Sequence, residues 1–132
     1  MSTFRIPDYR SKQKLLYVDK TSPDTIQNYG DSFFEDGRLS DALEFYIRAN
    51  YVSGLQKIKD AALQSGDTML FGQAAKALHQ ELKPADWEAV GKKALELKKY
   101  SFARHALEKA DNEEMLNSLK NIMQKEVDEK KA

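Results

Sequence analysis

Apolar residues recur at helical spacing along most of the chain, and no strand-rich segment is visible. The clearest case is the C-terminal part, where apolar side chains three, four or seven positions apart form one stripe on an otherwise polar segment. The members of this stripe are Met115, Leu116, Leu119, Ile122, Met123 and Val127. The pattern predicts an all-α fold that ends in an amphipathic helix over residues 112–129.

A repeat organises the preceding part of the chain. Residues 23–56 and 84–117 align without gaps over 34 positions at a shift of 61 residues, and seven positions are identical. The identical pairs are Pro23/Pro84, Gly30/Gly91, Glu35/Glu96, Ser40/Ser101, Ala42/Ala103, Ala49/Ala110 and Leu55/Leu116. Most of these residue types shape helix ends and helix contacts. Each copy is therefore interpreted as two helices joined by a turn.

The shared residues have predicted roles in such a hairpin. The proline suits the first position of a helix, where no N–H partner is required. Ser40 and Ser101 are predicted to cap the second helix of each copy. A glycine inside a helix costs about 1 kcal/mol relative to alanine. Gly30 and Gly91 therefore predict close approach of a neighbouring helix, with Ala42 and its counterpart filling the space from the other side.

These residues resemble the tetratricopeptide repeat, a 34-residue helix–turn–helix unit. The matching residues are Ile26, Tyr29, Gly30, Phe33, Ala42, Tyr46 and Ala49 in the first copy, and Trp87, Val90, Gly91, Ala103, Leu107 and Ala110 in the second. The second copy departs from the family pattern at Ala94, where an aromatic residue is usual, and both copies lack the terminal proline. The resemblance implies a short right-handed α-solenoid of helical hairpins with a C-terminal capping helix.

The segment between the two copies, residues 57–83, is shorter than one repeat and does not show the family pattern. With the six residues before it, this divergent hairpin predicts two helices that separate at Gly66, with Asp67 capping the second. Gly72 marks another position of close helix contact. We expect a single helical-repeat domain over residues 23–132.

Charge is balanced over the whole chain but not locally. There are 21 basic and 21 acidic side chains, without the basic excess of a general nucleic-acid binder. Residues 1–22 contain five basic and two acidic side chains, whereas residues 23–56 contain two basic and six acidic ones. The basic leader therefore either packs on the acidic segment or forms a solvated tail, and a partly ordered tail is our prediction.

Composition also bears on chemistry and location. The absence of cysteine removes disulfides, thiolate metal ligands and cysteine nucleophiles. No apolar run reaches the roughly 18 to 20 residues of a membrane span, and the N-terminus has no apolar signal region. His79 and His105 fall on different predicted helices, with no carboxylate at a recognisable ligand spacing. We predict a cytoplasmic protein with no membrane partner, no cofactor or metal site, and no enzymatic activity.

The family resemblance also implies a binding groove, lined by the first helix of each repeat. By family register the groove positions are Asp24, Gln27, Asp31, Phe34 and Glu35 in the first copy, and Ala85, Glu88, Lys92, Leu95 and Glu96 in the second. The acidic residues of the first copy would repel an acidic peptide, so a basic or apolar peptide or helix suits this groove better.

The function that we expect is protein–protein interaction, as a small adaptor or scaffold that binds a peptide or helix through apolar contacts at Phe34 and Leu95. One alternative is an RNA-associated helical repeat that uses the basic leader and the lysines of Lys92–Lys99. Another is a subunit of a larger assembly or of a homo-oligomer. The sequence does not identify the partner.

Overall fold

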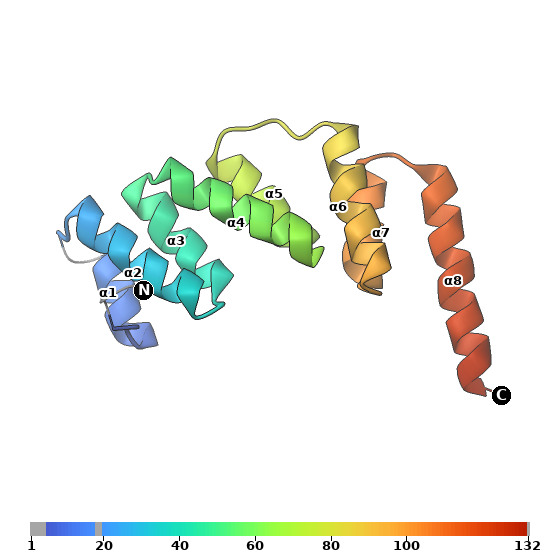
Figure 1. The fold of residues 1–132 in the computed structure, drawn as a ribbon, viewed down its shortest axis with the longest axis horizontal. Coiled ribbons are helices and arrows are strands. Elements are labelled where there is room, and N and C mark those ends of the chain that lie inside the picture. The colour runs from blue at the N-terminus through green and yellow to red at the C-terminus, as the bar shows by residue number, and fades with distance from the viewer. Residues whose placement is uncertain (1–4, 18–19, 132) are drawn as a thin grey trace. The chain divides into compact units, whose positions relative to one another are not determined.

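The computed structural model describes residues 5–17 and 20–131, and this part of the chain is helical and contains no strand (Figure 1). Its helices are α1 (Tyr9–Tyr17), α2 (Pro23–Glu35), α3 (Leu39–Ala49), α4 (Val52–Ser65), α5 (Thr68–Ala77), α6 (Pro84–Glu96), α7 (Tyr100–Lys109) and α8 (Glu113–Lys131). The all-α prediction is confirmed. None of the described helices has the length and apolarity that crossing a membrane requires.

The chain divides into two compact units. The first contains the residues up to Ile58 together with Ala77–His79, and the second contains Lys59–Lys76 and the residues from Gln80 onward. Helix α4 contributes its first half to the first unit and its second half to the second. In the first unit α2 packs against α3, and in the second unit α6 packs against α7.

The shift of 61 residues relates the helices as well as the sequence. The first helix of each copy covers the same aligned positions, because α2 spans Pro23–Glu35 and α6 spans Pro84–Glu96. The second helices also start at aligned positions, Leu39 in α3 and Tyr100 in α7. The predicted role of the shared proline is confirmed, since it begins both first helices.

The prediction that Ser40 and Ser101 cap the second helices is wrong. Each serine is the second residue of its helix, and the N-caps are Arg38 and Lys99, neither of which makes a side-chain capping hydrogen bond. The physical reason is the turn that precedes the cap. Gly37 has a φ of +77°, and its aligned residue in the second copy is also left-handed, so the chain reverses and enters the helix before the serine.

The predicted close approach at the shared glycine is confirmed, although its partners differ from those expected. A Cβ atom on Gly30 would lie 2.7 Å from the ring of Tyr46 and 3.2 Å from the Cβ of Phe45. A Cβ atom on Gly91 would lie 3.2 Å from the side chain of Leu107. The second helix therefore brings residues beyond the first shared alanine to the glycine, and in α3 these residues are aromatic.

Helix α1, in the basic leader, packs on α3. Leu16 is buried, and the Nζ of Lys12, itself a buried residue, lies 2.6 Å from Oδ1 of Asp41 and also contacts Glu44. The Nε of Arg48 donates a hydrogen bond of 2.9 Å to the carbonyl oxygen of Leu16. This part of the leader therefore packs on the acidic segment, the first of the two alternatives. Residues 1–4, 18 and 19 of the leader lie outside the described residues.

The ion pair between α1 and α3 changes the acidity of both partners. Burial disfavours the charged form of Lys12, but its hydrogen bonds to Asp41 and Glu44 outweigh burial and raise the pKa of Lys12. Burial also disfavours the charged form of Asp41, but Lys12 and Arg38 outweigh it and lower the pKa of this carboxyl group. The folded state therefore favours the charged form of both groups.

In the second unit, the turn between α4 and α5 contacts α6 and α7. A Cβ atom on Gly66, whose φ is +68°, would lie 2.7 Å from the Cα of Ala94 in α6. The Oγ1 of Thr68 donates a hydrogen bond of 3.0 Å to the carbonyl oxygen of Phe102, and the Nζ of Lys99 donates one of 2.5 Å to the last carbonyl of α4. Only glycine fits at the centre of this contact, because both the φ value and the space exclude a side chain.

The predictions made for the divergent hairpin are confirmed in the same region. Gly66 follows the last residue of α4, and Oδ1 of Asp67 accepts a hydrogen bond of 3.0 Å from the backbone N–H of Leu70 in α5. Gly72 is also a contact position, since a Cβ there would lie 2.9 Å from the ring of Trp87. The expectation of one repeat domain over residues 23–132 stays a prediction.

The packing of the second copy predicts different effects for two neighbouring residues. Ala103 is fully buried, so Ala103→Leu should lower the free energy of unfolding by about 1 to 3 kcal/mol through overpacking. Ser101 is exposed and does not cap α7, so Ser101→Ala should change it by no more than about 0.5 kcal/mol. Urea unfolding followed by circular dichroism measures both. This packing would be contradicted if Ala103→Leu left the free energy of unfolding unchanged. It would also be contradicted if Ser101→Ala lowered that free energy by about 1 kcal/mol, as the loss of a helix cap does.

The contact between α1 and α3 should depend on pH. The lowered pKa of Asp41 means that its stabilisation is complete above the unfolded value of about 3.9 and is lost as pH falls through the folded pKa. The raised pKa of Lys12 means that its stabilisation is complete below about 10.4 and is lost as pH rises through the folded pKa. The difference in unfolding free energy between the natural chain and Lys12→Met should therefore be constant near neutrality and shrink at strongly acidic pH. A difference that is unchanged at pH values where Asp41 is protonated would contradict this account.

Candidate functional site

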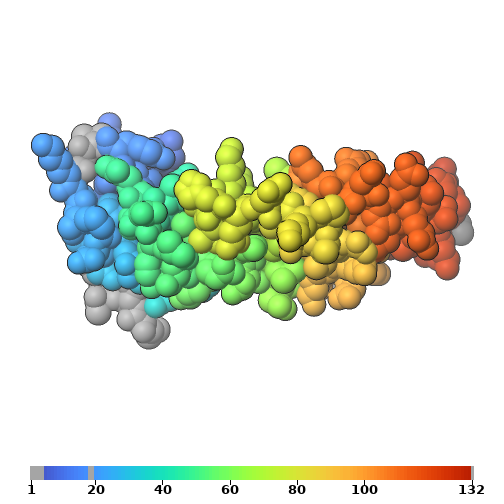
Figure 2. Space-filling model, turned by 90° about the horizontal axis from the view of Figure 1, so that it is seen from above, coloured from blue at the N-terminus to red at the C-terminus, as the bar shows by residue number. Residues whose placement is uncertain are grey.

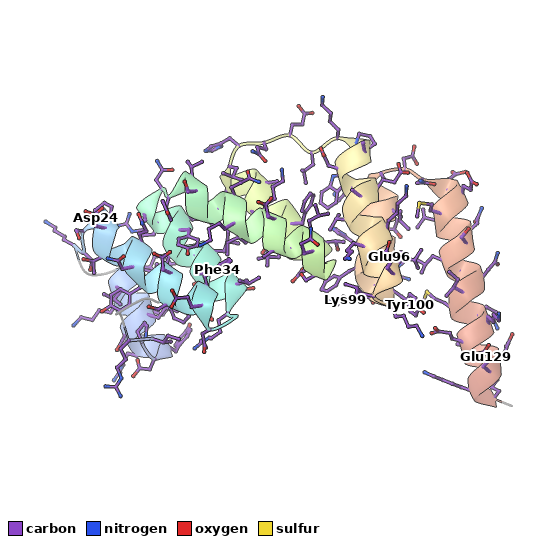
Figure 3. The ribbon with its side chains drawn as sticks, in the orientation of Figure 1. Asp24, Phe34, Glu96, Lys99, Tyr100 and Glu129 are labelled. Atoms are coloured by element: carbon purple, nitrogen blue, oxygen red, sulfur yellow. The ribbon has the colours of Figure 1, made fainter. Side chains whose placement is uncertain are left out.

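The predicted groove positions of the first copy all lie within α2, with Asp24 and Phe34 near its two ends (Figure 3). Phe34 is half-buried, and the Nζ of Lys57 lies 4.6 Å from the centre of its ring, within the range of a cation–π contact. Oδ1 of Asp31 accepts a hydrogen bond of 2.6 Å from the hydroxyl of Tyr46. Burial, together with this hydrogen bond, raises the pKa of Tyr46 far above its ordinary value. Asp31 therefore joins α2 to α3.

The other predicted positions of α2 are Gln27, which is half-buried, and Glu35, which is exposed. This surface of the first unit thus combines one aromatic ring with several acidic side chains and a lysine. Its partly exposed ring is a contact point for an apolar side chain, and its carboxylates favour a basic ligand over an acidic one.

The predicted groove positions of the second copy all lie within α6, and Glu96 is at the end of this helix (Figure 3). Oε1 of Glu88 lies 3.5 Å from Nζ of Lys92, and Oε2 of Glu96 lies 3.7 Å from Nζ of Lys93. These are exposed ion pairs within one helix, which contribute little to stability. Ala85, the other position given by the family register, is exposed.

The predicted apolar contact of α6, Leu95, is only half-exposed, because it packs against the buried cluster of the second unit. That cluster contains Ala94, Ala103, Leu107 and Leu119. Leu95 therefore has a structural role in this unit, and only part of its side chain is accessible to a partner. The α2 positions belong to the first unit and the α6 positions to the second.

A groove that the sequence pattern does not predict lies between α7 and α8 in the second unit. Its volume is about 560 Å³. Arg104 and Glu108 of α7 and Leu116, Leu119, Lys120, Met123, Gln124 and Val127 of α8 line it. In the space-filling view the atoms of α7 and α8, orange to red, form one continuous surface (Figure 2). The lining thus contains four apolar side chains, together with two basic groups, one acidic group and one amide.

The groove exists because the apolar stripe of α8 is broader than the contact that α7 covers. Leu119 is buried, and the hydroxyl of Tyr100 donates a hydrogen bond of 2.5 Å to Oε1 of Glu126, so α8 is held to α7 over more than one turn. Met123 and Val127 nevertheless remain 37% and 46% exposed. From the sequence, we expected the whole stripe to close the core. The signal that this expectation missed is the number of apolar positions, which exceeds what one neighbouring helix can bury.

The two histidines lie in different parts of the fold, and His79 is exposed. His79 follows the end of α5 with a φ of 57°, and the ring of His105 packs edge-on against Trp87 at 5.7 Å between ring centres. Among the described residues, no group of three or more histidine, aspartate and glutamate side chains is arranged to hold a metal ion.

Comparisons with protein-family models, with curated proteins and with solved structures find no match to this chain. The support for a function therefore comes from the chain's own surfaces, above all the α7–α8 groove.

A buried and a half-exposed residue of the α8 stripe should respond differently when their side chains are shortened to alanine. Leu119→Ala removes a buried side chain and should lower the free energy of unfolding by about 2 to 5 kcal/mol. Val127→Ala removes atoms from a half-exposed side chain and should cost no more than about 0.5 kcal/mol. Urea unfolding of the two variants tests this division. A large loss for Val127→Ala would show that the groove is closed in solution.

Proposed function

We propose that this chain is a protein–protein interaction module, a small adaptor or scaffold that binds a helix or peptide of a partner. The observation that carries the proposal is the α7–α8 groove, in which Met123 and Val127 present apolar surface that the core does not use. A partner that covers this surface gains about 25 cal/mol for each Å² of apolar area removed from water. Binding of this kind needs no catalytic group.

The chemistry of the groove favours an amphipathic helix as the ligand. Helical ligands place side chains three and four positions apart on one face, and the apolar residues that line the groove are also three and four positions apart along α8: Leu116, Leu119, Met123 and Val127. The polar lining carries both signs of charge, with Arg104 and Lys120 opposite in sign to Glu108. We therefore expect a partner helix with an apolar stripe bordered by both acidic and basic residues.

The first-helix surfaces are proposed as a second contact area, as the family resemblance implies. On α2 the half-buried ring of Phe34 lies beside Lys57, and the acidic residues of the same helix favour a basic or apolar peptide. On α6 the ion pairs and Leu95 supply polar and apolar groups. The two surfaces differ in charge, so one partner need not occupy both.

We also propose that the fold is a short right-handed α-solenoid of helical hairpins, similar to tetratricopeptide repeats, with α8 as its cap. Three features that recur at the same shift of 61 residues support this proposal: the first-helix bounds, the glycine contact at Gly30 and Gly91, and the left-handed residue at Gly37 and Lys98. The middle hairpin, α4 and α5, is the divergent member.

The alternative of RNA binding has less support. Lys12 is held by two carboxylates, Lys92 and Lys93 pair with acids of their own helix, and Lys99 binds a carbonyl oxygen. Four of the seven lysines named for that role are therefore engaged within the chain, and a phosphate group would have to displace these contacts. A non-enzymatic, cytoplasmic role without a cofactor completes the proposal, and self-association is an outcome that the experiment below distinguishes.

The test compares two charge-matched variants of α8. Met123→Asp with Val127→Asp places two carboxylates in the groove, and Asn117→Asp with Asn121→Asp places two on exposed positions outside it. A partner retained from an extract by the immobilised natural chain is purified and titrated by calorimetry. We expect binding at least about tenfold weaker for the groove variant, a loss of about 1.4 kcal/mol, and no change for the control.

Two further results decide between alternatives. If the groove variant binds the partner normally and the double variant Phe34→Ala with Glu35→Lys does not, the partner binds the α2 surface. That result would contradict the proposal that the α7–α8 groove is the binding site. Light scattering over a dilution series tests whether the natural chain self-associates. A dimer that the groove variant abolishes would identify a second copy of this chain as the occupant.

A further inference from the structure

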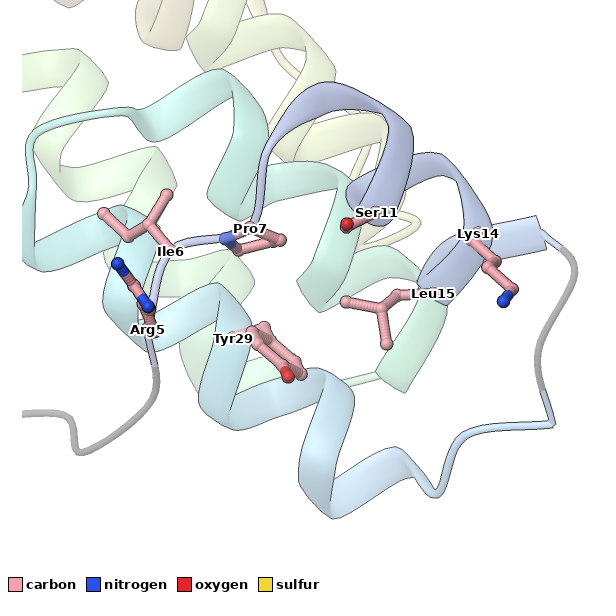
Figure 4. A pocket seen from close by; sticks show the side chains of 7 residues that line it. All are labelled: Arg5, Ile6, Pro7, Ser11, Lys14, Leu15 and Tyr29. Carbon is pink, nitrogen blue, oxygen red and sulfur yellow. The ribbon is translucent and has the colours of Figure 1, made fainter.

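A second cavity lies in the first unit, between the segment before α1, α1 itself and α2 (Figure 4). Its volume is about 350 Å³, which is enough for a few side chains but not for a folded domain. Two basic side chains line it, Arg5 and Lys14, and they lie at opposite ends of the cavity in Figure 4. The α7–α8 groove belongs to the other unit, so this cavity is independent of the proposed function.

The charge of the cavity is positive. Its lining contains no carboxylate among the described residues. Asp8, which follows the lining residue Pro7, caps α1 by accepting a hydrogen bond of 2.8 Å from the backbone N–H of Ser11. Lys12, in the same helix, is neutralised by Asp41 and Glu44. The bases of the cavity are thus left to attract an external anion.

The middle of the cavity combines apolar side chains with the hydroxyl groups of Ser11 and Tyr29. The side chains of Pro7, Leu15 and Tyr29 lie between the two bases in Figure 4. Leu15 and Tyr29 are half-buried, so part of each side chain is open to a ligand. A ligand that matches this arrangement has an apolar group between two negative groups.

We propose that this cavity binds an acidic peptide segment of a partner protein, in which an apolar side chain lies between two carboxylates. The apolar side chain packs on Leu15 and Tyr29, and the carboxylates pair with Arg5 and Lys14. Guanidinium and ammonium groups form charge-assisted hydrogen bonds with carboxylates, which are stronger than neutral ones.

A peptide fits the surroundings better than a nucleic acid does. A nucleic acid carries one negative charge for every nucleotide beyond the cavity, and these charges would meet residues 23–56, which contain six acidic and two basic side chains. A short peptide confines its carboxylates to the cavity. Only two basic side chains line the site. Strong binding of a nucleic acid requires basic side chains at more phosphate groups than this.

The experiment uses the full chain and a synthetic probe, acetyl-Asp-Leu-Asp-amide, with the neutral analogue acetyl-Asn-Leu-Asn-amide as the peptide control. Binding is followed by nuclear magnetic resonance of the ¹⁵N-labelled chain. We expect shifts at Ser11, Leu15 and Tyr29 with the acidic probe, at least about tenfold weaker binding of the neutral analogue, and affinity that falls with salt.

Matched variants test the site. Arg5→Gln with Lys14→Gln removes both bases of the cavity, and Arg10→Gln with Lys20→Gln removes the same charge from exposed positions of the same segment outside it. The first pair should weaken binding of the acidic probe at least about tenfold, and the second should change it less than twofold. Neither pair alters the contact of Lys12 with α3, and circular dichroism checks that both variants fold.

Three results would overturn the proposal. They are absence of probe binding by the natural chain at millimolar concentration, equal loss in both variant pairs, and tighter binding of a single-stranded oligonucleotide of the same charge than of the peptide. The variant Met123→Asp with Val127→Asp should bind the acidic probe normally. Failure of the α7–α8 groove proposal and failure of this one are therefore distinguishable.

Discussion

The close contact between the two helices of a hairpin, made at a glycine, is the constraint on which the rest of the structure depends. A side chain at Gly30 would overlap the ring of Tyr46, and one at Gly91 would press on Leu107. The glycine costs about 1 kcal/mol of helix propensity, which the burial of a large side chain against it offsets. Tyr46 then reaches Asp31 with its hydroxyl, so the same contact fixes one residue of the candidate α2 surface.

A hairpin packed in this way leaves its outer faces to other elements, and the two units cover them differently. In the first unit α1 contacts α3 through one buried leucine and an ion pair, and the segment before α1 leaves a basic cavity beside α2. In the second unit α8 contacts α7 through Leu119, but its stripe is broader than this contact. The cavity and the groove are both consequences of incomplete coverage.

Sequence periodicity and helix-end residues predicted the helices well, because Pro23, Pro84, Gly66 and Asp67 act locally. The serine caps were predicted wrongly, since the turn with a left-handed residue before each second helix places the N-cap two positions earlier, at Arg38 and Lys99. Opposite charge suggested that the leader contacts the acidic segment, but it did not identify Lys12 as the buried group. Neither the α7–α8 groove nor the cavity of the first unit was predicted, because each is formed by side chains from separate segments of the chain, as with Arg5 before α1 and Tyr29 in α2.

Hydrogen–deuterium exchange of the full chain, alone and saturated with its purified partner, shows directly whether the α7–α8 groove is covered in the complex. We expect slower exchange in α7 and in the part of α8 from Leu116 to Val127, because a ligand in the groove suppresses local opening there. Slower exchange confined to other helices, with α8 unchanged, would contradict the claim that the α7–α8 groove is where this chain binds a partner.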